Sequence, residues 1–229
     1  MRLISDIFRS HAVFDEHGRH TNGTDKESNH HYGDAYEWLF TLRSEVRNSN
    51  TRTKHNPCAY FCVECGSDYD FHYPCCSKAQ YTSRSTRDEI RLVMEVGVAD
   101  GACLRAWREV FPNATVVGMD IHPSSLAHGE RIEFHLGDQR SQVDCDRAAA
   151  GRYFDMIVDD ATHQLEDTLR TMLYLWPRVK PGGLYVVEEF PNVGALRSNI
   201  VSMWPWAEII DTVGPFGGVE PLVAIRRPT

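Results

Sequence analysis

Acidic side chains and one histidine follow two apolar segments in the C-terminal half of the chain. The segment 154–158 leads directly into Asp159 and Asp160, with His163 shortly after them, and the segment 184–187 leads into Glu188 and Glu189. Short apolar runs bounded by polar residues predict buried strands, and parallel strands end at one edge of a sheet. We therefore expect four carboxylates and an imidazole to meet at that edge.

Carboxylates gathered in this way repel one another unless a positive charge lies among them. A divalent ion that prefers oxygen ligands, such as Mg²⁺, is the simplest source of that charge, and salt bridges to lysine or arginine are the alternative. The neighbouring His163 adds a group that can accept a proton beside the acids. The pattern favours a metal-assisted reaction over a purely structural ion cluster.

A glycine-containing turn earlier in the chain predicts a nucleoside site. The apolar run 91–96 ends beside Gly97, and Gly101 precedes a helical pattern that continues to residue 110. A second apolar run, 115–119, ends on Asp120, a position from which a carboxylate can accept hydrogen bonds from ribose hydroxyls. The turn lacks the middle glycine of the dinucleotide fingerprint, so the ligand is not expected to carry a pyrophosphate. An ordinary strand-to-helix turn is the alternative.

The remaining elements complete an α/β fold. A third short strand, 132–135, is followed by Asp138 and Gln139, which either meet an adenine or form a simple turn. Residues 180–183 predict the turn into the strand 184–187, and the C-terminal part supplies a helix and two more strands. We expect a Rossmann-like, doubly wound, seven-stranded sheet with helices on both faces.

Length and composition divide the chain into three parts. Its 229 residues suit one α/β domain with an appendage. We divide the chain into an N-terminal helical or lid segment (1–47), a Cys-rich insertion (48–87) and a Rossmann-like core (88–229). The net charge of -8 argues against nucleic acid as the main partner. Without an apolar run near the ~20 residues of a membrane span, or a signal-peptide core, we expect a cytoplasmic protein with no membrane partner.

The insertion contains five of the seven cysteines. Cys62 and Cys65 have the spacing of half a zinc site, and Cys58 and Cys75 are further candidate ligands for a structural Zn²⁺. Free thiols and disulfides are the alternatives, because a second clean cysteine pair is missing.

Ordered sequence blocks outside the insertion resemble one known family, the metal-dependent sugar O-methyltransferases of macrolide tailoring, of the mycinamicin and macrocin type, with cephalosporin hydroxylase-like proteins as broader kin. The blocks are Gly23-Thr24-Asp25-Lys26 with His30, Tyr32, Tyr36 and Glu37; Glu95-x-Gly97; Trp107 with Phe111-Pro112-Asn113-Ala114; Gly118-x-Asp120-Ile121; Gly137-Asp138-Gln139; Asp159 to His163; and Pro181 to Glu189. The family usually reads D-D-G-S-H at residues 159–163, where this chain has Asp-Asp-Ala-Thr-His, and E-D where it has Glu188-Glu189. The last difference lengthens one metal ligand by a methylene.

The resemblance implies roles for individual residues. Asp160, Glu188 and Glu189 would bind Mg²⁺ or a similar divalent ion, and His163 would be the general base beside Asp160. Residues implied in binding S-adenosylmethionine are Thr24, Lys26, Glu95, Gly97, Asp100, Gly101, Asp120, Ile121, Asp138, Gln139 and Asp159. The implied reaction is methyl transfer to a hydroxyl of a sugar or a glycosylated natural product.

Two other functions stay open at this point. A catechol or polyketide hydroxyl is an alternative acceptor, because such enzymes also use Mg²⁺ and neighbouring oxygens. A non-catalytic, nucleoside-binding fold with a zinc-bearing interaction module is the alternative from another class. The expected partner is a small glycoside or other hydroxylated acceptor, and since family members commonly self-associate, the resemblance is compatible with a homo-oligomer.

Overall fold

The computed structural model describes residues 2–14, 16, 20–24, 26, 32–40, 60–61, 68–69, 86–124, 127–190, 192–205, 208–212 and 222–228. Within this part of the chain no helix is both long and apolar enough to cross a membrane.

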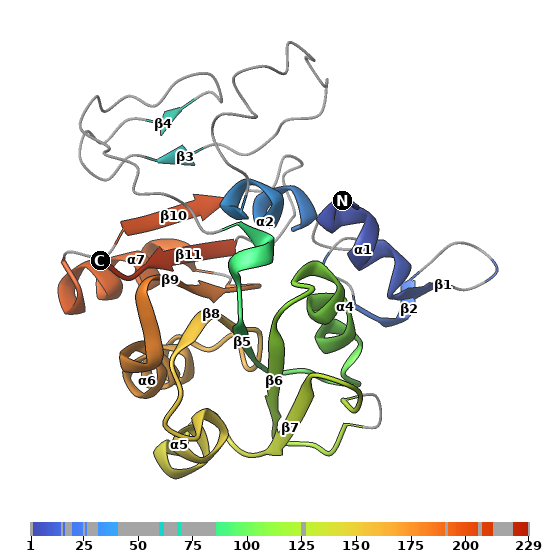
Figure 1. Cartoon of the computed structure of the whole chain (residues 1–229). Helices are drawn as coiled ribbons and strands as arrows, with labels where there is room; N and C mark the ends of the chain where they lie inside the picture. Colours follow the sequence, from blue (N-terminus) through green and yellow to red (C-terminus); the bar gives the residue numbers. More distant parts are fainter. Residues whose placement is uncertain are drawn as a thin grey trace.

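A mixed seven-stranded sheet forms the centre of the molecule, in the order β10-β11-β9-β8-β5-β6-β7 (Figure 1). The strands are β5 (Leu92–Val96), β6 (Thr115–Asp120), β7 (Ile132–Leu136), β8 (Phe154–Asp159), β9 (Val179–Val187), β10 (Glu208–Thr212) and β11 (Leu222–Arg226). From β7 to β9 neighbouring strands are parallel, and β11 and β10 add antiparallel pairs. The chain adds β6 and β7 on one side of β5 and then returns to the other side with β8, so the order reverses between β5 and β8. Ligand crevices in open α/β sheets form at such a reversal.

Helices cover both faces of this sheet. They are α4 (Ala102–Val110), α5 (Gln142–Ala149), α6 (Leu165–Leu175) and α7 (Val193–Met203), with short 3₁₀ turns at Arg87–Glu89 and Trp176–Arg178. Successive strand residues enter opposite cores, because side chains alternate along a strand. Val93 packs in the core that contains Trp107 of α4, and Met94 packs in the core that contains Met172 of α6. The α/β architecture predicted from the sequence is confirmed.

The N-terminal segment packs against α4. It comprises α1 (Ile4–Ser10), the antiparallel pair β1 (Ala12–Phe14) and β2 (His20–Gly23), and α2 (Gly33–Phe40). The fully buried Trp107 has the ring of Phe8 at 5.0 Å and that of Tyr36 at 4.7 Å, both edge-on, and Phe40 packs against Phe111 at 4.9 Å. These aromatic contacts attach the N-terminal segment to α4 and to the residue that follows it, and α1 lies beside α4 in Figure 1.

Little of the predicted Cys-rich insertion belongs to the described residues. They include β3 (Tyr60–Phe61) and β4 (Asp68–Tyr69), which form an antiparallel pair. The candidate zinc ligands Cys58, Cys62, Cys65 and Cys75 lie outside the described residues. The structural zinc therefore stays a prediction.

Two elements differ from the sequence-based expectation. Residues 180–183, predicted as a turn, lie within β9 as an irregular stretch, since Phe154 pairs with Val179 and Met156 with Leu184. Backbone hydrogen bonds between residues 182–183 and Arg227 hold this stretch in the sheet. Helix α5 was not predicted, because its buried residues, Cys145, Ala148 and Ala149, are too small to produce a clear apolar period.

Candidate active site

A cavity of about 650 Å³ lies at the carboxyl ends of the parallel strands. Its walls are residues 96–100 after β5, 119–122 at the end of β6, 137–140 after β7, 160–163 after β8, Glu189 after β9, and Gly23, Thr24, Lys26 and Cys103. Small-molecule sites commonly have volumes of roughly 300–1,000 Å³. The cavity is therefore large enough for a nucleoside and part of an acceptor.

Gly97 brings the loops after β5 and β8 into contact. Its φ is +83°, and a Cβ built on it would clash with the carbonyl oxygen of Asp160 and lie 2.6 Å from Cα of Ala161. From the sequence, Gly97 was assigned to the binding of S-adenosylmethionine. Gly97 does line the cavity, but the space beside its Cα is filled by the backbone of the protein itself.

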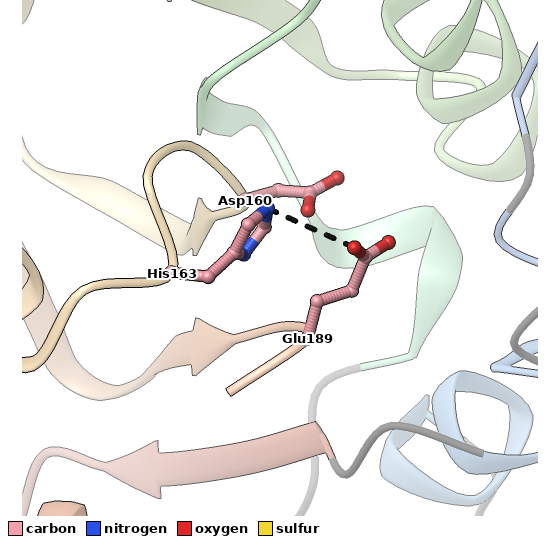
Figure 2. Close-up of side chains that lie close together, drawn as sticks. All are labelled: Asp160, His163 and Glu189. Carbon is pink, nitrogen blue, oxygen red and sulfur yellow. Dashed lines mark ion pairs between the residues drawn. The ribbon is translucent and has the colours of Figure 1, made fainter. Parts of the chain in front are cut away.

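Asp160, His163 and Glu189 line the cavity, and Figure 2 shows their side chains close together; we call this part of the wall the rim. One ligand atom of each lies within 4.8 Å of the others, and Nε2 of His163 is 3.7 Å from Oε2 of Glu189. His163 and Glu189 both have positive φ, +56° and +55°. Strained backbone of this kind is concentrated at functional sites. The strain here turns two polar side chains from neighbouring strand ends toward one another.

A buried ion cluster lies behind the rim. Nζ of Lys26 is 2.9 Å from Oε1 of Glu95 and 3.0 Å from Oδ2 of Asp160, and it also contacts Oε2 of Glu188. The hydroxyl of Tyr36 donates a hydrogen bond to the other carboxylate oxygen of Glu188. Glu188 is thus directed toward the N-terminal segment, while Glu189 lies at the cavity.

Burial and charge have opposite effects on this cluster. Burial lowers the pKa of Lys26, but the carboxylates around it together raise the pKa by more than burial lowers it. The pKa of Lys26 therefore lies well above the usual value. Burial also raises the pKa of Asp160 and of Glu95, and in both cases the Lys26 ammonium opposes this only in part. Lys26 is therefore a permanent positive charge, and the acids depend on it for their ionised form.

The part of the cavity wall predicted to bind the nucleoside, which we call the nucleoside wall, contains Asp120, Asp138 and Gln139. Oδ2 of Asp120 accepts hydrogen bonds from the backbone nitrogens of residues 98 and 99, at 2.9 and 3.0 Å. Asp138 pairs with Arg140, and hydrogen bonding to that guanidinium lowers the pKa of Asp138. Gln139 is buried, donates to Thr171 at 2.9 Å and accepts from the nitrogen of Thr162 at 3.2 Å. Gln139 thus supports the loop that carries His163.

Asp159 lies behind the cavity wall, and its side chain is buried. Its carboxylate accepts hydrogen bonds from the hydroxyl of Tyr185 at 3.0 Å and from Nε2 of Gln139 at 3.4 Å. Burial raises the pKa of Asp159 to about 7. Its charge is therefore costly in the folded state near neutral pH.

Replacing Asp159 by asparagine should flatten the dependence of stability on pH. The folded state holds the proton of Asp159 up to about pH 7, whereas the unfolded chain releases it near the ordinary value of 3.8. Wild-type stability should therefore fall as pH rises between these values, and Asp159→Asn should gain up to ~1.4 kcal/mol per pH unit relative to wild type. Urea unfolding of both proteins at pH 5 and 6.5 measures the difference. Equal slopes for the two proteins would contradict the assignment.

The structure brings most of the predicted site residues to one cavity. Those on its walls are Thr24, Lys26, Gly97, Asp100, Asp120, Ile121, Asp138, Gln139, Asp160, His163 and Glu189. Glu95, Gly101, Asp159 and Glu188 do not line it. The sequence reasoning gave no role to Tyr32 or Tyr36, although both belong to the N-terminal block. Tyr32 accepts a hydrogen bond from the nitrogen of Glu189 at 3.2 Å, and Tyr36 contacts Glu188.

Comparison with known proteins gives sequence matches over about half of the chain. Demethylmacrocin O-methyltransferase of Streptomyces fradiae is 36% identical over 115 residues, which are 46% of this chain and 29% of that protein. The 8-demethyl-8-alpha-L-rhamnosyl tetracenomycin-C 2'-O-methyltransferase of Streptomyces olivaceus is 34% identical over 127 residues, 52% of this chain and 31% of that protein. The matched segments thus span less than a third of these relatives.

A solved structure of the MycE methyltransferase from the mycinamycin biosynthetic pathway, in complex with Mg, SAH and mycinamycin VI, has a similar fold. It is 26% identical with a TM-score of 0.51, over 62% of this chain and 45% of that one. A family model described as a methyltransferase domain matches residues 94–185. Residues 94–185 of this chain are thus similar to a methyltransferase domain, and the similar proteins include enzymes named as O-methyltransferases.

Proposed function

We propose that the chain is an S-adenosylmethionine-dependent, Mg²⁺-assisted O-methyltransferase that acts on a hydroxyl of a sugar or a glycosylated natural product. The observation that carries the proposal is the position of His163 beside the carboxylates of Asp160 and Glu189, on the rim of a cavity large enough for a nucleoside. The relatives support the sugar as acceptor, since one is named for a rhamnosyl substrate and the MycE complex contains a mycinamycin.

The cavity walls suit S-adenosylmethionine. Oδ2 of Asp100 is buried and has no hydrogen-bond partner among the described residues, so it can accept from the ammonium of the methionine portion. Each oxygen of Asp120 can accept more than one hydrogen bond, which leaves capacity for ribose hydroxyls beside the backbone contacts. The exposed side chain of Ile121 adds apolar surface on the same wall.

Asp160 and Glu189 suit a divalent ion that prefers oxygen ligands. Their carboxylates reach one point on the rim together with His163. Mg²⁺ favours carboxylate oxygen over imidazole nitrogen and keeps several of its waters, so the two acids would hold it and His163 would stay available for a proton. Glu188 was the third predicted ligand, but it already contacts Lys26 and Tyr36 through its two oxygens.

The proposed chemistry is proton removal coupled to methyl transfer. When bound, Mg²⁺ lowers the pKa of a hydroxyl that it contacts. Nε2 of His163 takes the proton from the acceptor hydroxyl, whose oxygen forms a bond to the methyl carbon as the bond from that carbon to the sulfonium sulfur breaks. Glu189 lies 3.7 Å from Nε2, so its carboxylate is an ion-pair partner for the protonated ring.

Incubation with methyl-labelled S-adenosylmethionine tests this function. The purified chain is offered a panel of macrolide glycosides and a panel of catechols, before and after exhaustive chelation of divalent ions. We expect label in glycosides only, loss of transfer on chelation, and recovery when Mg²⁺ is returned. Label in catechols alone would assign a different acceptor. Full activity after chelation would contradict an essential role for Asp160 and Glu189 as metal ligands.

A further inference from the structure

The buried acids behind the rim form a second arrangement with the spacing of a cation site. Carboxylate oxygens of Glu95, Asp160 and Glu188 lie within 4.8 Å of one another, as do the ligand atoms of the outer set, Asp160, His163 and Glu189. Asp160 is common to both sets. We call the set of Glu95, Asp160 and Glu188 the inner cage.

The inner cage already contains a cation. The ammonium of Lys26 forms ion pairs with all three carboxylates and donates hydrogen bonds to Asp160 and Glu188. Its side chain is 1% exposed, and those of Glu95 and Glu188 are 0% exposed. The ring of Trp107, with its centroid 5.8 Å from Nζ, adds a cation–π contact.

We propose that the ammonium of Lys26 occupies a second cation site in place of a divalent ion, so that the protein binds one divalent ion, held by Asp160 and Glu189 of the outer set. The inference extends the proposed function, because it concerns the same acids. It explains why four acids, Glu95, Asp160, Glu188 and Glu189, lie around a site for one metal ion. Lys26 of the N-terminal segment provides the positive charge for the inner cage, and Asp160 contacts both Lys26 and the rim.

The protein environment favours an ammonium over Mg²⁺ at this position. Mg²⁺ demands near-octahedral coordination and normally keeps several waters. The inner cage is closed to solvent on the side of Glu95 and Glu188, and Tyr36 uses one of the oxygens of Glu188. A hydrated ion has no room there while the lysine stem is present.

Two variants separate loss of charge from gain of space. Lys26→Met removes the charge and fills the volume of the stem, whereas Lys26→Ala removes the charge and opens the cage to an ion with its waters. Lys180→Met is the matched control, because Lys180 pairs with Asp155 at 2.7 Å and does not line the cavity.

Titration with Mn²⁺, followed by electron paramagnetic resonance and calorimetry, counts the bound ions. We expect about one equivalent for wild type, Lys26→Met and Lys180→Met, and about two for Lys26→Ala, with a larger rise in Tm on adding Mn²⁺ for Lys26→Ala than for Lys26→Met. One equivalent in a folded Lys26→Ala, or two in wild type, would overturn the proposal. If Lys26→Ala is unfolded without metal, the proposal requires millimolar Mn²⁺ to restore its far-UV circular dichroism, and failure to do so overturns it.

The count of ions does not depend on methyl transfer. A wild-type chain that binds one Mn²⁺ and methylates no acceptor would contradict the proposed function, and the gain of an ion in Lys26→Ala would still support the inner site. An active wild-type enzyme, together with a folded Lys26→Ala that binds only one Mn²⁺, would support the proposed function and overturn the inner site.

Discussion

Replacing His163 by alanine is expected to lower the rate of methyl transfer by roughly 10²–10⁴-fold, the usual contribution of a positioned general base. The affinity for S-adenosylhomocysteine should stay unchanged, because the proposed cofactor contacts come from residues 97–100 and from the wall of Asp120, Asp138 and Gln139, not from the imidazole. Single-turnover transfer from labelled S-adenosylmethionine gives the rate, and calorimetry with S-adenosylhomocysteine gives the affinity. A wild-type rate in the variant would remove His163 from the mechanism.

The backbone at His163 requires its own control. Its φ of +56° is unfavourable for alanine, whereas asparagine adopts this region more easily. His163→Asn therefore keeps the loop conformation while removing the imidazole, and it should lose as much rate as His163→Ala. His128, which is exposed and does not line the cavity, offers the matched histidine. His128→Asn should transfer methyl groups at the wild-type rate.

The location of the site could be predicted from the sequence, because alternating apolar runs and helical patterns indicate a parallel sheet. Apolar runs predicted the parallel strands, and polar residues after those runs had to share one edge. Asp120, Asp160, His163 and Glu189 accordingly line a single cavity. The order of strands around β5 supplies the crevice in which they meet.

The partners of the acids could not be predicted in the same way. Lys26 and Glu188 are 162 positions apart, and no local pattern says which side of a strand end a loop lysine will approach. The sequence interpretation allowed for lysine as a counter-ion but gave Lys26 itself a cofactor-binding role. The burial of Lys26 explains its role as a counter-ion, since an ammonium on a side chain that is 1% exposed must be paired with negative charge.

Neighbouring residues at a strand end also differ in ways that local sequence does not encode. Glu188 and Glu189 are adjacent and chemically alike, yet one is buried against Tyr36 and the other lies on the rim. The separation follows from the positive φ of Glu189, a conformation that no sequence signal for a non-glycine residue indicates. Asp159 and Asp160 divide similarly between the core and the cavity.

We expect the second large effect from a substitution of Gly97, because a Cβ at this position would strain both the loop after β5 and the loop after β8. In Gly97→Ala the new methyl would lie against the carbonyl oxygen of Asp160 and the Cα of Ala161. These are backbone atoms and cannot rotate away, so the loop that carries Asp160 and His163 must shift. We expect a loss in the free energy of unfolding of roughly 2–4 kcal/mol, as the sum of strain at positive φ and overpacking.

Gly151 isolates the steric part of this effect. Its φ of +73° resembles the +83° of Gly97, but nothing lies within 4 Å of a Cβ built on it. Gly151→Ala should therefore lose only the backbone contribution, roughly 1–2 kcal/mol, and retain wild-type affinity for S-adenosylhomocysteine and Mn²⁺. Gly97→Ala should lose affinity for both, since residues 97–100 and Asp160 move together. Urea unfolding and calorimetry on the two variants make the comparison. If both lose the same stability and keep both ligands, the contact between the loops after β5 and β8 is not what requires glycine at position 97.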